Sequence, residues 1–389
     1  MHGIFSLYGV FFSSLQNALG SNRAVISGAS SLAFFLEGVF AIVSGRLTDK
    51  FGPKMVMTVC GLMFGLGYFL MSQITSLWQL YLIYPAIIGI AASSGNVSLL
   101  STVTRWFVKR RGLMTSIVKV GTGAAMFIMP LVAGWLISDY GWRNAYLVLA
   151  IVSVVGITSI SQFLKRDPSQ MGLQPYGMYD TNGLISGFAT DVQLSLRDTM
   201  RTRQFWAVSV VYFIAWYATL SIIVHIAPYA IDSGISMTQA AGIVSVIGAV
   251  SIAGRLTMGS TGDKLGNRRA LIICFMILTV ALSWLLLVKS PWMLYLFAVV
   301  YGFAHGGFFA IMSPLVAELF GTTSHGVNLG MVLFLGQIGG SMGPVVTGLI
   351  FDVTHSYQLA FLILIAASLG ALILTIVQIK PIRVLRSTI

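Results

Sequence analysis

The sequence predicts an all-α membrane protein in which twelve transmembrane helices form two pseudo-symmetric six-helix bundles. Three observations lead to this prediction. The 389 residues are 57% hydrophobic and only 9% charged, and their mean hydropathy is +0.88. Apolar segments of membrane-spanning length recur along the whole chain, and one cationic motif occurs twice. A soluble protein of this length needs far more charge to cover its surface.

Each of twelve apolar segments has, or nearly has, the ~20 helical residues that cross a hydrocarbon core. They cover residues 1–18, 24–46, 53–72, 78–105, 111–137, 143–164, 204–230, 238–261, 269–288, 291–317, 325–350 and 357–379. The first segment barely spans. No basic region precedes it and no small-residue cleavage pattern is evident, so we interpret it as a helix and not as a signal peptide.

The two bundles follow from an internal repeat with a constant offset of 214 residues. Trp78 recurs as Trp292, and Pro130 recurs as Pro344. A constant period over half the chain indicates two structural copies. The only long polar stretch between helices is 165–203, which is rich in proline and glycine. We therefore expect an N-terminal bundle at 1–164, a cytoplasmic linker at 165–203 and a C-terminal bundle at 204–389.

The placement of the basic residues predicts the topology. Eighteen Lys and Arg residues fall in loops on one side, and only Arg23, Arg143 and Lys289 fall on the other. The positive-inside rule then places both termini in the cytoplasm of a multi-pass protein of the plasma (cytoplasmic) membrane, in contact with lipids. The net charge of +12 is clustered between apolar runs and not along one face, which excludes a nucleic-acid partner.

The repeated motif begins at Gly45 and again at Gly259, each time at the end of an apolar segment. Its acidic and basic side chains lie at cytoplasmic helix ends, where ion pairs can hold two helices together and release them. We expect a cytoplasmic gate of this kind, although a fixed topological anchor explains each cation nearly as well. The candidate gate residues are Arg46, Asp49, Lys50, Asp263 and Lys264.

Paired halves in so apolar a chain are typical of a transporter that rocks one half against the other around a central site. Three ionisable residues deep in apolar helices do not recur: Arg255, Lys119 and Glu37. Such groups cost on the order of 2.5–3.5 kcal/mol to insert, so they usually line a cavity or pair with one another. At ~1.5 Å per residue, Arg255 and Lys119 lie roughly 12 Å from the cytoplasmic boundary and Glu37 roughly 18 Å.

Several motifs resemble those of a known family. The repeated Gly-x-x-x-Asp-(Arg/Lys)-x-Gly-x-(Arg/Lys) loop resembles the signature of the major facilitator superfamily. The stretches that begin at Arg105, His225, Gly254, Gly343 and Ser356 resemble its monocarboxylate-transporter and oxalate:formate-antiporter branch. This resemblance implies the major facilitator fold, alternating access, and a signature loop that stabilises the outward-facing state.

The resemblance also implies that Arg255 holds the substrate carboxylate, for which a guanidinium offers two parallel hydrogen bonds. The chain departs from the branch elsewhere. Ser251 stands where the monocarboxylate transporters have an acid, Ser13 where they have a lysine, and the antiporter's second cation in helix eleven is missing. In the superfamily fold helix five packs beside helix eight, so Lys119 could join Arg255.

The other candidates carry alternatives that the sequence leaves open. In one interpretation Lys119 is functional and binds substrate or carries the coupling proton. In the other it simply neutralises Glu37, and the two interpretations weigh equally. Glu37 and His225 are further candidates for proton coupling, but for His225 a structural histidine is the favoured interpretation. His305 lies among glycines in an expected packing or hinge segment. Polar residues on helices that line the cavity in this fold add three further candidate substrate contacts: Tyr8, Asn96 and Asn328.

The expected function is secondary active transport of a small organic anion, a monocarboxylate, by alternating access. Proton symport is the first choice of coupling and exchange with a counter-anion, including dicarboxylate/monocarboxylate exchange, the second. Efflux of amphipathic compounds is a rival. A channel is disfavoured because no filter-like sequence recurs, and an enzyme because the histidines are scattered. We expect no cofactor and no metal.

Overall fold

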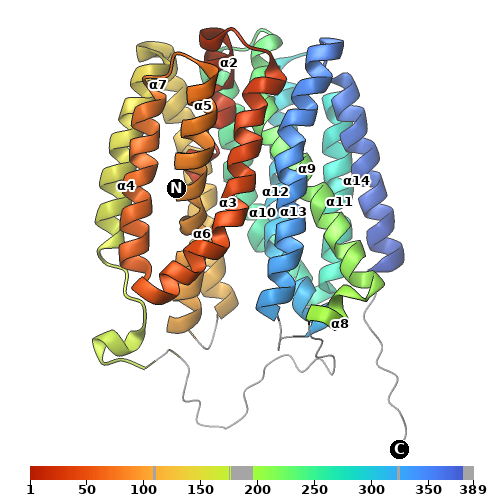
Figure 1. Ribbon diagram of the computed structural model, residues 1–389. Helices are drawn as coiled ribbons and strands as arrows, with labels where there is room; N and C mark the ends of the chain where they lie inside the picture. The colour runs from red at the N-terminus through yellow and green to blue at the C-terminus, as the bar shows by residue number, and fades with distance from the viewer. Residues whose placement is uncertain (108–110, 175, 177–195, 322–324, 380–389) are drawn as a thin grey trace, which may run out of the picture. The chain divides into compact units, whose positions relative to one another are not determined.

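The computed structural model describes residues 1–107, 111–174, 176, 196–321 and 325–379, and most of these residues are helical (Figure 1). Ten helical segments in the described part are long and apolar enough to cross a membrane. The helices that build them are α3 Arg23–Phe51, α4 Pro53–Met71, α5 Leu77–Ile83 with η1 Tyr84–Gly89 and α6 Ile90–Trp106, α7 Arg111–Ser161, α9 Arg203–Asp232, α10 Met237–Leu265, α11 Asn267–Leu285, α12 Pro291–Phe320, α13 His325–Thr354 and α14 Gln358–Gln378.

Each predicted segment coincides with helix in the structure. The first is formed by two short helices, α1 His2–Phe5 and α2 Tyr8–Leu19. Two others join in α7, where Gly141 interrupts the helix with a φ of 79°. Several helices run past the predicted ends because backbone hydrogen bonding continues after the apolar pattern stops. The prediction of an all-α membrane protein is confirmed.

The repeated motif adopts the same backbone turn in both copies. Gly52 joins α3 to α4 with φ 85° and ψ 159°, and Gly266 joins α10 to α11 with φ 89° and ψ 143°. This conformation is essentially restricted to glycine, because a Cβ atom would collide with the backbone. The sequence repeat therefore reflects a repeated structural requirement: a sharp reversal between consecutive helices.

The chain forms two compact units. The first unit comprises Met1–Thr181, Leu220–Ala249 and Ser341–Tyr357, and the second comprises Asn182–Thr219, Val250–Gly340 and Gln358–Ile389. Segments of α9, α10 and α13 thus pack with the N-terminal helices in the first unit. The predicted division into 1–164 and 204–389 around a linker stays a prediction, and residues 175 and 177–195 of that linker lie outside the described part.

In the first unit α4 lies beside the second half of α7 (Figure 1). Two glycines on α4 allow the approach: a Cβ atom at Gly65 would lie 2.1 Å from Val154 and one at Gly61 would lie 2.6 Å from Ile157. Small residues permit such close packing where the lipid offers little hydrophobic driving force. α3 packs against α6 and the π-helical turn η1 that precedes it.

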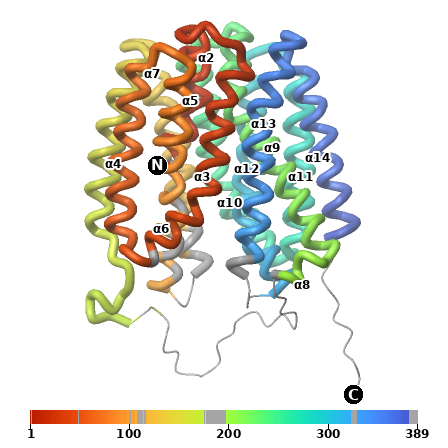
Figure 2. Tube along the Cα trace, viewed as in Figure 1, coloured from red at the N-terminus to blue at the C-terminus, as the bar shows by residue number. Residues whose placement is uncertain are grey.

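In the second unit α11 packs between α12 and α14 (Figure 2). The last cation of the second motif copy, Arg268, donates hydrogen bonds to the carbonyl oxygens of Ile376 at 2.5 Å and Thr375 at 3.4 Å. These carbonyls belong to the last turn of α14, which has no intrahelical donors left for them. Arg268 therefore anchors the end of α14.

In the second unit α10 and α12 cross at close range. A Cβ atom at Gly254 would lie 2.1 Å from the carbonyl oxygen of Phe303, and one at Gly306 would lie 2.0 Å from that of Ser251. Each helix thus presents a glycine to the backbone of the other, and no side chain separates them. This crossing positions the side chains next to each glycine contact.

Candidate functional site

Arg255 lies on α10 immediately after Gly254, at the crossing with α12. Only 9% of its surface is exposed. Its guanidinium carbon lies 5.7 Å from the centroid of the Phe309 ring on α12. A cation near an aromatic face gains electrostatic attraction while it stays desolvated. The depth that the sequence predicts for Arg255 therefore coincides with a buried environment next to an aromatic side chain.

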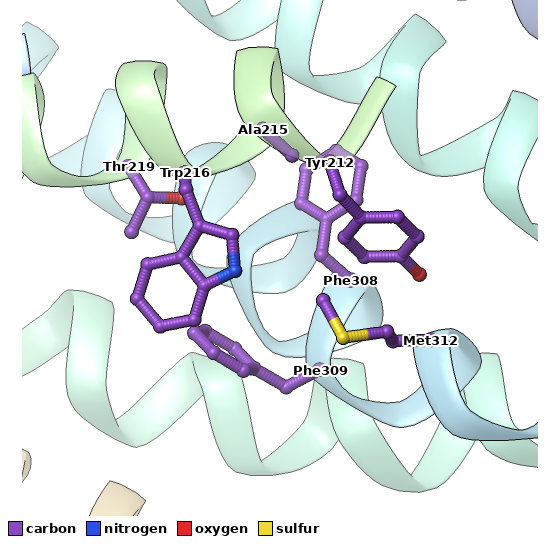
Figure 3. A pocket seen from close by; sticks show the side chains of 7 residues that line it. All are labelled: Tyr212, Ala215, Trp216, Thr219, Phe308, Phe309 and Met312. Carbon is purple, nitrogen blue, oxygen red and sulfur yellow. The ribbon is translucent and has the colours of Figure 1, made fainter. Parts of the chain in front are cut away.

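Beside Arg255, the same unit contains a recess lined mostly by aromatic side chains (Figure 3). The lining residues come from α9 (Tyr212, Ala215, Trp216, Thr219) and α12 (Phe308, Phe309, Met312). The rings of Trp216 and Phe309 meet edge to face at 5.2 Å between centroids. Phe309 thus joins the recess to the guanidinium, so an anion at Arg255 would have apolar walls beside it.

His305 lies one turn before Phe309 on α12 and is 5% exposed. Its ring stacks on Tyr301 at 5.9 Å and meets Phe309 edge to face at 5.1 Å. Arg255 acts electrostatically on His305. Two polar groups of different kind, a guanidinium and an imidazole, are therefore brought together by the α10–α12 crossing.

This arrangement can bind a carboxylate. A guanidinium presents parallel N–H donors that match both carboxylate oxygens, and it keeps its charge at any working pH. The aromatic walls exclude water, which strengthens the attraction between the charges. Sequence reasoning identified Arg255 because it does not recur in the repeat. It missed Trp216 and Phe309, because aromatic residues are frequent on membrane helices and no sequence pattern singles these two out.

Lys119 and Glu37 both belong to the first unit, on α7 and α3, and both side chains are half-buried. Glu37 acts electrostatically on the buried Tyr84 of η1. Arg255 belongs to the second unit, so the expected two-cation site stays a prediction. A pair between Lys119 and Glu37 also stays a prediction.

The three polar candidates have different environments. Tyr8 is buried on α2 and its hydroxyl donates to the carbonyl of Ile26 at 2.5 Å. Its single proton is thus already used, although its oxygen can still accept a bond. Asn328 on α13 is fully buried, and neither of its amide atoms has a hydrogen-bond partner among the described residues. The side chain of Asn96 lies outside the described part.

A second polar cluster, the Arg23 cluster, lies in the first unit where α3 begins and α9 and α13 end. Arg23 contacts both carboxylate oxygens of Asp232 at 2.6 and 2.7 Å and donates to the Tyr357 hydroxyl at 2.5 Å. Its guanidinium carbon stacks 3.8 Å from the centroid of Phe351. Asp352 accepts from the backbone N–H groups of Arg23 and Ala24 at 2.9 and 2.7 Å. A carboxylate of α13 therefore caps the N-terminus of α3, where negative charge is favoured.

His225 completes the Arg23 cluster. One ring nitrogen, Nε2, lies 2.8 Å from the carbonyl of Pro344, and the other, Nδ1, lies 3.0 Å from the Tyr357 hydroxyl. A carbonyl only accepts, so Nε2 carries the proton and Nδ1 accepts from Tyr357 in a neutral ring. Both nitrogens have partners, which favours the structural interpretation of His225; its role in proton coupling stays a prediction. Three of the family-like motifs, those containing His225, Asp352 and Tyr357, meet here.

The candidate cytoplasmic gate is only partly visible. Arg46, Lys50, Asp263 and Lys264 are exposed at the helix ends that flank the glycine turns. The Lys50 ammonium lies 5.1 Å from the centroid of the Phe51 ring. The side chain of Asp49 lies outside the described part. The gate therefore stays a prediction, while Arg268 in the second copy shows the anchoring role that the alternative expects.

Three comparisons relate the chain to known proteins: by sequence profile, by sequence identity and by fold. The sequence profile of the Major Facilitator Superfamily matches residues 1–260 and 206–386. Monocarboxylate transporter 13 of Bos taurus is 27% identical over 93% of this chain and 82% of that protein. Monocarboxylate transporter 12 of Rattus norvegicus is 27% identical over 91% of this chain and 77% of that protein. A bacterial homolog to the human lysosomal transporter Spinster, inward-facing and unoccupied, has a TM-score of 0.69 at 16% identity, over 97% of this chain and 91% of that chain. At that identity the structural likeness shows the fold alone.

Proposed function

The chain belongs to the major facilitator superfamily, and from this premise we propose that it moves a small monocarboxylate across the membrane by alternating access. The observation that carries the proposal is the buried guanidinium of Arg255 beside Phe309 and the aromatic recess. A buried cation is costly in a membrane protein, so such a residue usually binds a substrate or pairs with another group. The names of the relatives, monocarboxylate transporters 12 and 13, support the same substrate class.

Proton symport is the proposed coupling. Glu37 and Lys119 are half-buried ionisable groups on membrane helices, the kind of residue that carries protons in transporters. In the first unit the Arg23 cluster joins α3 to the ends of α9 and α13, and we propose that it closes the non-cytoplasmic side. It must break when that side opens.

Uptake of radiolabelled lactate into proteoliposomes tests the proposed function. We expect uptake that saturates, rises severalfold when the outside is made acidic, and falls when a protonophore collapses the gradient. Protein-free liposomes are the control. Uptake that requires an internal anion and ignores the proton gradient would show exchange instead. Uptake that does not saturate would show a channel, and dye extrusion without lactate uptake would show efflux of amphipathic compounds.

The roles of Lys119 and Glu37 can be separated by stability measurements. If the two side chains neutralise each other, Lys119→Ala is expected to lower the unfolding free energy by about 1–3 kcal/mol, because an acid is left partly desolvated without its counter-charge. The double variant Lys119→Ala with Glu37→Gln is then expected to recover that loss. Melting temperatures of both single variants and the double, with and without lactate and oxalate, provide the measurement.

The opposite result would assign Lys119 to the substrate. Losses that add up in the double variant, together with weakened binding of oxalate but not of lactate to Lys119→Ala, would mean that Lys119 serves a second carboxylate. Exchange of dicarboxylates and monocarboxylates would then replace proton symport as the better description.

A further inference from the structure

We propose that His305 is a second substrate-binding residue, which hydrogen-bonds an oxygen on the carbon next to the carboxylate, so that the transporter selects 2-hydroxy and 2-oxo monocarboxylates. This inference rests on the proposed function, because it presumes that the carboxylate itself binds Arg255. It adds a residue and a subclass of substrate to that function.

The helix crossing places the two side chains in the same region. Arg255 follows Gly254, which contacts the backbone of α12 at Phe303; His305 precedes Gly306, which contacts the backbone of α10 at Ser251. Both side chains lie against the same ring, that of Phe309, at 5.7 Å from the guanidinium carbon and 5.1 Å from the imidazole centroid. A ligand at Arg255 thus has the imidazole as a polar neighbour and aromatic rings as its other neighbours.

The imidazole retains unused hydrogen-bonding capacity. His305 is 5% exposed, and its Nδ1 atom has no hydrogen-bond partner among the described residues. Its neighbours on α12, Tyr301 and Phe309, offer it ring faces and edges. A buried polar atom without a partner costs stability, and a ligand oxygen within reach would satisfy it.

The chemistry of the imidazole suits a neutral oxygen. The positive charge of Arg255, which acts on His305, disfavours a second positive charge nearby. A neutral imidazole has one donor and one acceptor nitrogen. It can donate to a keto oxygen, and it can donate to or accept from a hydroxyl group. Lactate and pyruvate carry such an oxygen on the carbon next to the carboxylate, whereas propanoate of the same chain length does not.

Binding of lactate, pyruvate and propanoate to the wild-type protein and to His305→Phe tests this role. The phenyl ring preserves the stacking on Tyr301 and removes both nitrogens. We expect wild-type protein to bind lactate and pyruvate roughly ten- to hundredfold more tightly than propanoate, because an analogue without the oxygen leaves the imidazole unpaired. In His305→Phe the affinities for lactate and pyruvate are expected to fall by about the same factor, while propanoate binds within about twofold of wild type.

Two further variants make the outcome decisive. His305→Gln retains a donor and an acceptor and is expected to recover part of the preference for lactate, whereas Arg255→Lys is expected to weaken all three acids alike. Should His305→Phe not fold, His305→Gln carries the test through its ratio of lactate to propanoate affinity. Equal effects of His305 variants on all three acids, or a wild-type protein that does not distinguish lactate from propanoate, would overturn the inference and leave the proposed function standing. Binding and uptake of none of the acids would overturn the proposed function and the inference with it.

Discussion

Arg255→Lys is expected to lower the transport efficiency for lactate, kcat/KM, by about a hundredfold, although the charge is kept. A lysine ammonium is a point charge with no planar pair of N–H donors, so it cannot reproduce two parallel bonds to a carboxylate. Each charge-assisted bond contributes about 1.5–3 kcal/mol, so the loss of even one gives an effect of this size. The lysine side chain is also shorter than that of arginine, so its ammonium extends less far from α10 past Phe309, and this adds to the loss.

Kinetics of lactate uptake in proteoliposomes provide the measurement. Arg269→Lys is the matched control, since Arg269 is an exposed arginine at the start of α11 in the same unit. It is expected to leave transport unchanged. If Arg255→Lys transports with near wild-type affinity, Arg255 contributes only its charge, and the carboxylate model of the site is wrong.

Arg23→Gln is expected to give the largest conformational effect. The substitution removes the cation from the Arg23 cluster and leaves Asp232 without its partner, while Tyr357 loses the donor at 2.5 Å. Asp232 is partly exposed, which limits the loss to about 1–3 kcal/mol. A change of 1.4 kcal/mol alters a two-state ratio tenfold, so the population with the non-cytoplasmic side open is expected to rise roughly five- to hundredfold.

Distances between spin labels on Ser21 and Thr354, in a background without Cys60 and Cys274, measure that population. Arg143→Gln is the matched control. Arg143 is predicted to lie on the same side of the membrane, stacks on Trp142 and donates to the carbonyl of Ile74 at 3.1 Å, all among N-terminal helices. An unchanged distance distribution in Arg23→Gln, or an equal shift in Arg143→Gln, would show that the Arg23 cluster does not hold α3 to the ends of α9 and α13.

The helices and the buried charges could be predicted because their causes are local. Apolar length sets where a chain crosses the membrane, and a charge that fails to recur at its repeat position stands out in the sequence itself. Arg255 was found in this way. The repeated motif could also be found in the sequence, but the turns with positive φ at Gly52 and Gly266 appear only in the structure.

The Arg23 cluster and the aromatic recess could not be predicted, because both depend on contacts between distant parts of the chain. Arg23 stood out only as one of few cations on its side of the membrane, and its partners Asp232 and Tyr357 lie 209 and 334 residues away. From the sequence, His305 is expected in a packing or hinge segment because it lies among glycines. Those glycines do serve packing, and they also bring the imidazole to the crossing with α10.

Where α10 crosses α12, backbone meets backbone through Gly254 and Gly306, and no side chain is available to slide or repack. Closely packed interiors move as blocks and resist gradual deformation. We therefore expect the spacing between Arg255 and His305 to stay constant while the site turns from one face of the membrane to the other. Arg255 and His305 would then offer the substrate the same contacts at both faces, and the concentrations of substrate and coupling ion on the two sides would determine the direction of net flow.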